Sequence, residues 1–290
     1  MIILNDRTIQ ADLVKIFKDE LEIIGLDVSD ITSVHDVFYS YFVMHKRLIS
    51  TRKRVVHYSN GFVCPAASQG ALGLLVGKIE EGMNLNPYLS KKMRDVSYQD
   101  KMLFDWDVYH LHLGLNEDND GYIHRTGALL FAMFDDDNAY LINIYNHKDH
   151  WTNKDVLNIV NESWPYLLER YKINAEPECD FSNEELKHIR KANVNTILKL
   201  NDGTCIYAPG LGLMTSGHSM WAMTQVTDIM HDIINVRKNI IDWVIAHPEL
   251  DGYDEMRLQR AGNQINCLLP YHKIAFPWMR MQSLIDKING

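Results

Sequence analysis

The chain has 290 residues, of which 46% are apolar and 23% are charged, and its formal net charge is −9. This length allows one or two domains with a large core, and the composition is that of an ordinary globular protein. No stretch approaches the roughly 20 apolar residues that cross a bilayer, and the first residues do not resemble a signal peptide. We therefore expect a cytoplasmic protein without a membrane partner. The acidic charge argues against an extended surface that coats nucleic acid.

The cysteines exclude one class of metal site. Cys64, Cys179, Cys205 and Cys267 stand far apart and form no CxxC pair. In a reducing compartment we expect free thiols, mostly buried. Their spacing excludes a zinc ribbon built on cysteine pairs.

Helical patterns dominate the first hundred residues. Apolar residues at helical spacing predict a helix over 13–24 that ends at Gly25. Asp30 is the expected N-cap of a second helix, and a third helix is predicted over 71–83. We therefore expect a mostly helical N-terminal region over 1–104 and an α+β core over 105–290. One continuous domain also fits this pattern.

The apolar period changes to two after residue 105. Alternating residues predict strands over 106–114, 128–134 and 140–145, separated by polar turns. Consecutive strands joined in this way are expected to pair antiparallel. The predicted fold class is therefore α+β, with a central antiparallel sheet flanked by helical N- and C-terminal regions.

Local signals also mark the C-terminal half. Thr152 is an expected N-cap, Ser182 and Glu185 match a capping box, and Asp202-Gly203 between apolar runs predicts a hairpin. A long helix is predicted over 219–244. Its apolar stripe is typical of a core contact or an oligomer interface, so we expect either a packing role or a homo-oligomer formed through this helix.

Histidine is the densest unusual feature of the chain. Five of the 13 histidines lie between residues 110 and 150. His110 and His112 stand two apart on a predicted strand, which places both side chains on one face. His147 and His150 follow the third predicted strand. If the first and third strands are neighbours, these four side chains converge.

One hypothesis for this cluster is a metal site. Imidazoles on one strand face can bind a single ion, and zinc or manganese would take its ligands from His110, His112, His147 and His150. The chain would then be a metal-dependent hydrolase. The alternative is that these histidines are hydrogen-bonded structural residues.

A second hypothesis is RNA cleavage without a cofactor. The 2′-hydroxyl attacks the adjacent phosphate while one side chain removes its proton, another protonates the leaving oxygen and a cation stabilises the charge. Histidine suits both proton transfers because it titrates near neutral pH. The candidate catalytic residues are His110, His112, Arg125, His147 and Lys148.

Within residues 105–151, the segment 125–148 (RTGALLFAMFDDDNAYLINIYNHK) resembles the final strands of the RelE/ParE/HigB-like bacterial toxins. In that superfamily a basic residue opens a strand, an acidic turn follows, and the last strand ends in His-Lys or His-Arg. The resemblance implies an RNase toxin with an antitoxin as its protein partner. It implies that Arg125 and Lys148 contact phosphate and that His147 transfers a proton. The chain departs from those short, basic toxins in its length, its acidic charge and its long C-terminal half.

A basic run precedes the predicted strands. Residues 46–54 hold five cations and no acidic residue, namely Lys46, Arg47, Arg52, Lys53 and Arg54. In a chain of net charge −9 such a cluster is a candidate nucleic-acid-binding segment. The alternative is a solvated helix end and loop.

Two further motifs are explained more simply as turns. Residues 116–127 imitate the start of an EF-hand loop, but Gly127 stands where the bidentate glutamate is needed. Residues 210–219 form a glycine-rich loop before a helix, which could present N–H groups to an anion. Ser216 and His218 in this loop are too close in sequence to count as a nucleophile and its base without other support.

These patterns favour a nucleic-acid-directed toxin or phage-defence-type protein with RNase-like activity. A metal-dependent hydrolase is the first alternative. The second is a non-catalytic protein-interaction module, in which the basic run or the long helix binds the partner.

Overall fold

The computed structural model describes residues 2–3, 6–146, 154–174, 180–247 and 254–289. The chain forms two compact units, one of residues 1–48 with 222–289 and one of residues 49–221. Helices and strands occur in both, which confirms the predicted α+β class. The boundary expected at residue 104 lies inside the second unit. No helix in the described part of the chain is long and apolar enough to cross a membrane.

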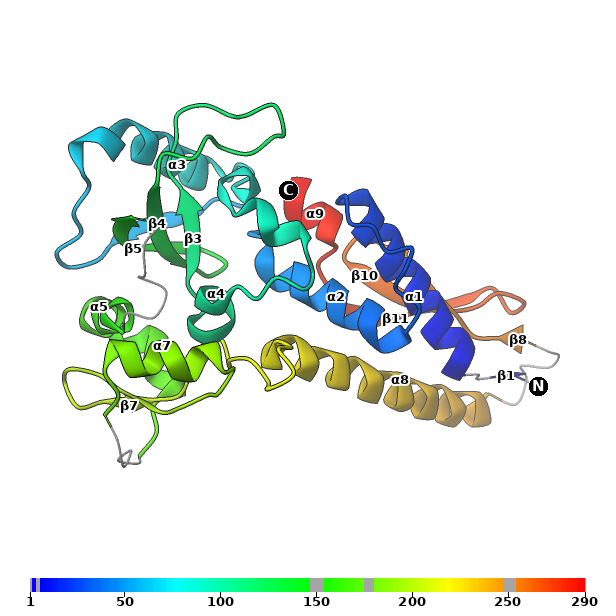
Figure 1. Cartoon of the computed structure of the whole chain (residues 1–290). Coiled ribbons are helices and arrows are strands. Elements are labelled where there is room, and N and C mark those ends of the chain that lie inside the picture. Colours follow the sequence, from blue (N-terminus) through cyan, green and yellow to red (C-terminus); the bar gives the residue numbers. More distant parts are fainter. Residues whose placement is uncertain (1, 4–5, 147–153, 175–179, 248–253, 290) are drawn as a thin grey trace. The chain divides into compact units, whose positions relative to one another are not determined.

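The first unit combines helices with a three-stranded antiparallel sheet of order β11-β10-β9 (Figure 1). Strand β1 pairs in parallel with β8. The elements of this unit are β1 (Ile2–Ile3), α1 (Asp6–Ile23), α2 (Val34–Arg47), α8 (Met220–Ala246), β8 (Asp254–Glu255), β9 (Arg257–Ala261), β10 (Gln264–Leu269), β11 (Ile274–Arg280) and α9 (Leu284–Asn289).

Helix α1 buries one face against α2. Ile9, Leu13, Phe17 and Leu21 repeat every four residues and are fully buried, as the helical period requires. The ring of Phe17 stacks on Tyr41 of α2, with ring centroids 3.9 Å apart. The apolar spacing that predicted this helix therefore also positions it.

One prediction for the first unit is wrong. The N-cap of α2 is Ser33 rather than Asp30, and its hydroxyl accepts a hydrogen bond from the first turn. Helices lie at both ends of the chain as predicted, and β9, β10 and β11 follow α8. Ile265, Cys267 and Leu269 alternate with less buried neighbours and are fully buried, which is the period of a strand with one face in the core.

The second unit is built around a four-stranded sheet of order β2-β5-β4-β3. Its regular elements are β2 (Val55–Tyr58), α3 (Gln69–Glu81), α4 (Lys101–Trp106), β3 (Tyr109–His112), β4 (Ala128–Phe134), β5 (Asn138–Asn146), α5 (Asp155–Ser163), α6 (Pro165–Leu168), α7 (Asn183–Lys191), β6 (Leu198–Lys199) and β7 (Cys205–Ile206). Short 3-10 turns cover Ala66–Ser68, Asn86–Tyr88, Lys91–Arg94 and Glu169–Tyr171.

The central sheet is mixed, and this corrects the prediction of an antiparallel sheet. Strands β3, β4 and β5 pair antiparallel as predicted. Strand β2 pairs in parallel with β5, with Val55 opposite Asn138. This strand directly follows the basic run, and the sequence analysis predicts no element for it. The predicted strand over 106–114 is also shorter, because α4 occupies 101–106.

Several local signals are confirmed. Ser182 and Glu185 form both hydrogen bonds of a capping box at the start of α7. The turn at Asp202-Gly203 joins β6 to β7, with Gly203 at φ 87°. The long helix spans Met220–Ala246, close to the predicted range. Thr152 and Cys179 lie outside the described residues, and the other three cysteines are free thiols.

Gly210 marks a close approach of two segments in the second unit. Its N–H donates to the Asp105 carbonyl oxygen at 2.9 Å. A Cβ at this position would come within 2.5 Å of the Leu103 carbonyl oxygen. We expect Gly210→Ala to lower the free energy of unfolding by about 1–3 kcal/mol, because backbone atoms must shift. Chemical denaturation measures this. Gly77→Ala is the control, since a Cβ there meets nothing within 4 Å, and it should stabilise helix α3.

Candidate functional site

The register of β3 places His110 and His112 opposite Phe131 and Leu129 of β4. Both histidines therefore point to the same face of the sheet, as the period of two predicts. This face also carries the main hydrophobic core, in which α5 packs against β4 and β5. The predicted convergence with the residues after β5 is not supported by the topology, because β4 separates β3 from β5. His147, Lys148 and His150 lie outside the described residues.

The two histidines of β3 have different environments. His112 is 2% exposed, so a large substrate cannot reach it without movement of the chain. The His110 side chain is 15% exposed and keeps contact with solvent. Its Nδ1 lies 3.8 Å from Oδ2 of Asp100, whose side chain is 16% exposed. This Nδ1 is itself buried and has no hydrogen-bond partner among the described residues. His110 is therefore the better candidate for chemistry.

Asp100 is held in place as the N-cap of helix α4. Its carboxylate accepts a hydrogen bond from the Leu103 N–H at 3.2 Å. The next residue, Lys101, donates to Oδ1 of Asn193 at 2.8 Å and to the Arg190 carbonyl oxygen. Arg190 in turn donates to the Lys101 carbonyl oxygen at 2.6 Å. These bonds fix α4, and α4 fixes the carboxylate beside His110.

A buried ion pair anchors the other end of α4. Nε of Arg190 donates to Oδ2 of Asp105 at 2.6 Å, and the two side chains are 5% and 8% exposed. The guanidinium also lies over the Trp106 ring, 3.9 Å from its centroid. Burial raises the pKa of Asp105 and lowers the pKa of Arg190, since it disfavours both charges.

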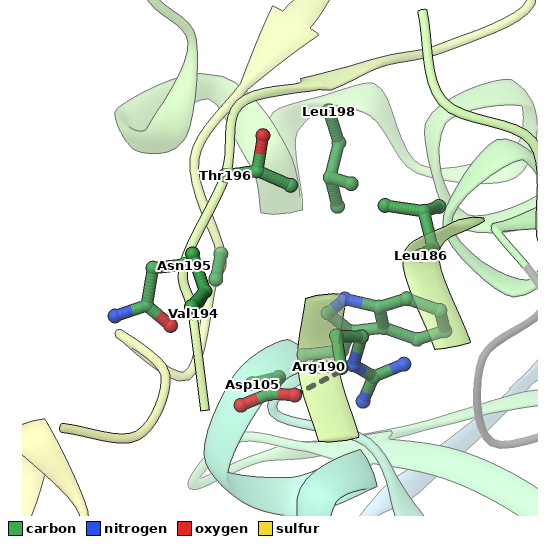
Figure 2. A pocket seen from close by; sticks show the side chains of 9 residues that line it. Asp105, Leu186, Arg190, Val194, Asn195, Thr196 and Leu198 are labelled. Carbon is green, nitrogen blue, oxygen red and sulfur yellow. Dashed lines mark hydrogen bonds and ion pairs between the residues drawn. The ribbon is translucent and has the colours of Figure 1, made fainter. Parts of the chain in front are cut away.

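Figure 2 shows the small pocket beside this pair. The other residues that line it are Trp106, Leu186, Val194, Asn195, Thr196, Leu198 and Ala208. Its walls are mostly apolar, and the only charged groups are those of the pair, which bond to each other. The pair therefore serves the fold of the second unit.

The basic run does not form one binding surface. It crosses the boundary between the two units after Leu48. Arg47 is buried in the first unit and Lys46 is half-buried. Among the five predicted cations, Lys53 alone is exposed.

Two arginines of the run are used within the second unit. Arg54 is buried and donates to the Asp135 and Ser50 carbonyl oxygens at 2.8 and 2.9 Å. Arg52 forms an ion pair with Asp136 at 2.7 Å. The acidic turn between β4 and β5 therefore binds two of the arginines that the sequence analysis gives as candidate nucleic-acid contacts.

Arg125 differs from these cations. It is exposed in the loop that precedes β4, and no ion pair links it to any residue that the structure describes. The loop is tied to the sheet because the Thr126 hydroxyl donates to the Leu113 carbonyl oxygen. Acidic residues of the same loop have local partners, since Asp118 hydrogen-bonds His124 at 3.0 Å and Asp120 forms an ion pair with Lys91. Arg125 is therefore available to an anionic ligand.

The segment of this loop that resembles the start of an EF-hand forms a turn. Glu117 and Ile123 form an isolated bridge, and the Asp118 N–H donates to the Tyr122 carbonyl oxygen at 2.7 Å. No group of three or more His, Cys, Asp or Glu side chains stands close enough to hold a metal within the described ranges. In the glycine-rich loop, Ser216 Oγ lies 2.9 Å from Nδ1 of His218, a local contact across two residues.

Sequence reasoning missed a polar network at the start of β5. His57 of β2 hydrogen-bonds Oδ1 of Asn138 at 2.8 Å. Asn138 and the Tyr140 hydroxyl both donate to Asp135, at 3.1 and 3.0 Å. The exposed Tyr166 donates to Tyr140 at 3.4 Å. These groups bond mainly to one another and join β2 to β5. The one sequence signal that could have revealed them is the strand pattern of residues 55–58, which the sequence analysis did not recognise.

The pKa values in this network follow from burial and hydrogen bonding. Burial acts to raise the pKa of Asp135, but hydrogen bonds from Asp137 and Asn138 outweigh it and lower this pKa. Burial raises the pKa of Tyr140, and its bond to Asp135 acts in the same direction. Asp135 is therefore ionised and Tyr140 protonated near neutral pH. This charge state matches a structural network better than a proton-transfer site.

Comparisons with known proteins do not assign the chain to a family. No family model matches the chain, and neither a curated protein nor a solved structure is similar to it. The candidate site therefore rests on His110 and Asp100 of the second unit. Arg125 lies apart from them, in the loop before β4 and six residues from the register partner of His110.

Proposed function

We propose that the chain is a cytosolic, nucleic-acid-directed hydrolase of the RNase type, in which His110 transfers protons. The observation that carries this proposal is the pairing of His110 with Asp100. One ring nitrogen faces a fixed carboxylate in a buried position, while the ring keeps contact with solvent. At 3.8 Å Oδ2 is beyond hydrogen-bond distance of Nδ1, so the two groups would have to approach each other in the substrate complex before Asp100 could orient the imidazole.

The proposed reaction needs no cofactor. The RNA 2′-hydroxyl attacks the adjacent phosphorus, and His110 accepts the proton that the hydroxyl loses. The bond to the 5′-oxygen breaks, a second acid protonates that oxygen, and a 2′,3′-cyclic phosphate remains. Arg125, exposed and without an ion pair among the described residues, would contact another phosphate of the same RNA and hold the strand. His147 remains the candidate second acid by sequence alone.

A toxin or phage-defence role fits this chemistry, because uncontrolled RNA cleavage arrests growth. A partner protein that blocks the His110 region would then act as the antitoxin. Asp100 is a positioning residue in this scheme, since it acts on the substrate only through His110.

Cleavage of a short fluorescent RNA by the purified chain tests the proposal. We expect His110→Ala to lower kcat/KM by about 10²–10⁴-fold, which is the usual contribution of a general acid or base. Asp100→Asn should lower kcat with little change in KM and shift the pH profile, because it disturbs the orientation of His110. His124→Ala is the matched control. That histidine is exposed and bonds Asp118 in the loop, so cleavage should be unchanged.

Other outcomes contradict the proposal in distinct ways. Absence of RNA cleavage by the wild-type chain, or full activity of His110→Ala, would overturn it. Activity that a chelator removes and zinc or manganese restores would instead support the metal-dependent hydrolase. Arg125→Ala should raise KM most at low salt and make KM less dependent on the salt concentration, since it removes a phosphate contact.

A further inference from the structure

The turn that follows β2 presents an Asn-Gly pair at the surface of the second unit. Asn60 and Gly61 are the two central residues of this turn, which the Phe62 N–H closes on the Ser59 carbonyl oxygen at 3.1 Å. Gly61 has φ 79°, a conformation that favours glycine at this position of a turn. Both residues are exposed, and a Cβ built on Gly61 would meet nothing within 4 Å. The space around the Asn-Gly peptide bond is therefore open.

The residues on either side of the pair are anchored to β5. The Ser59 N–H donates to the Leu141 carbonyl oxygen at 3.0 Å, and the Val63 N–H donates to Oδ1 of Asn143 at 3.3 Å. The Gly61 N–H, in contrast, has no hydrogen-bond acceptor among the described residues. The sheet therefore fixes the two ends of the turn and does not engage this N–H.

The Asn60 side chain is held by one long contact. Its amide nitrogen lies 3.4 Å from the Glu162 carbonyl oxygen, which is beyond the usual length of an N–H···O hydrogen bond. The backbone N–H of Asn60 donates to Oγ of Ser163 at 3.0 Å. These two contacts join the turn to the C-terminal end of α5. A small rotation of the side chain frees its amide group, because only the longer contact involves it.

We propose that Asn60-Gly61 is a site of spontaneous deamidation. The Gly61 nitrogen attacks Cγ of Asn60, a C–N bond forms, and the bond between Cγ and Nδ2 breaks. The amide nitrogen leaves as ammonia with the proton that the Gly61 nitrogen loses, and a five-membered succinimide remains. Water then opens either carbonyl of the ring, which gives aspartate or isoaspartate at position 60. Glycine favours the attack because no side chain crowds its nitrogen.

The reaction should weaken the contact between this turn and α5. The Asn60 amide donates to a carbonyl oxygen in the last turn of α5, whereas a carboxylate has no proton to donate. The carboxylate also brings negative charge to the negative end of the helix dipole. In the isoaspartyl form the main chain gains one carbon inside the closed turn. The C-terminal end of α5 should therefore open more often after the reaction.

Peptide mass spectrometry of the purified chain after incubation at about pH 8 tests the proposal. The tryptic peptide 55–78 should gain about 1 Da at residue 60, because an amide is replaced by a carboxyl group. Each converted chain also gains one negative charge, so a more acidic form should separate on anion exchange. Asn60→Gln is the matched variant. It keeps the amide but needs a six-membered ring for the same attack, so the acidic form should be lost.

Asp202-Gly203 is the internal control, since an Asp-Gly pair reaches isoaspartate through the same succinimide. Here the Gly203 N–H donates to the Leu200 carbonyl oxygen at 3.0 Å. Oδ2 of Asp202 accepts a hydrogen bond from the Asn161 amide at 2.7 Å. Both reacting groups are therefore engaged, and residue 202 should stay unmodified while residue 60 is converted.

The chain unfolded in urea is the reference for the rate, because both pairs are then free to react. A folded chain that keeps Asn60 intact while the unfolded chain is fully converted would overturn the proposal. A gain of acidic form that persists in Asn60→Gln would overturn it as well.

Hydrogen exchange measures the effect on α5. The last amides of this helix should exchange at least several-fold faster in Asn60→Asp than in the wild type, and equal rates would contradict the weakened contact. Asn60→Asp reproduces the charge of the product without the reaction. Neither measurement needs enzymatic activity, so the outcome is independent of the proposed RNase function.

Discussion

Asp105→Asn should lower the free energy of unfolding of the second unit by about 3–5 kcal/mol, which is the usual cost of breaking a buried ion pair. The substitution leaves the Arg190 guanidinium buried over Trp106 without its carboxylate. The guanidinium charge in this position is shielded from water and has no opposite charge beside it. Hydrogen exchange of β3 and β4 amides reports the stability of this unit separately from the first.

Two further variants show whether the charge is responsible. Asp19→Asn breaks the Lys15–Asp19 pair, which has the same 2.6 Å distance but is exposed, and should cause no measurable change. Asp105→Leu/Arg190→Met removes both charges together and should recover much of the lost stability. A single Asp105→Asn variant as stable as the wild type would show that the pair contributes little to the fold.

The first unit should lose stability in mild acid because of His45. Burial lowers the pKa of this imidazole to about 3, and the positive charge of Lys287 acts in the same direction. Its ordinary value is 6.5, so between these two pH values the unfolded chain binds more protons than the folded one. The free energy of unfolding is therefore not reduced by His45 above pH 6.5, and it decreases as the pH falls below that value. At pH 5 the loss should be about 2 kcal/mol.

Denaturant unfolding of the first unit at pH 7 and pH 5 measures this effect. His45→Phe should remove most of the difference between the two pH values, since it keeps a ring beside Tyr41 but cannot bind a proton. His35→Phe is the control, because that side chain is 49% exposed and its replacement should leave the pH dependence intact. An unchanged pH dependence in His45→Phe would assign the acid sensitivity to other groups.

The amino-acid sequence by itself determined the elements whose signals are local. The apolar spacing of α1 and α8, the capping box at Ser182, the Asp202-Gly203 hairpin and the antiparallel order of β3, β4 and β5 were all predictable. Each depends on residues within one helix, one turn or one pair of adjacent strands. Period and turn chemistry are properties of such short segments, so they can be read without the fold.

Only the tertiary structure decided the contacts between distant residues. Strand β2 joins β5 across 81 residues, as the His57–Asn138 bond shows, and Asp105 meets Arg190 across 85. The placement of Asp100 beside His110 and the burial of Arg54 depend on how helices and strands pack. A charged or titratable side chain has the same local pattern on a surface and in a core. The role of such a side chain depends on the groups it contacts and on its exposure to solvent in the folded chain.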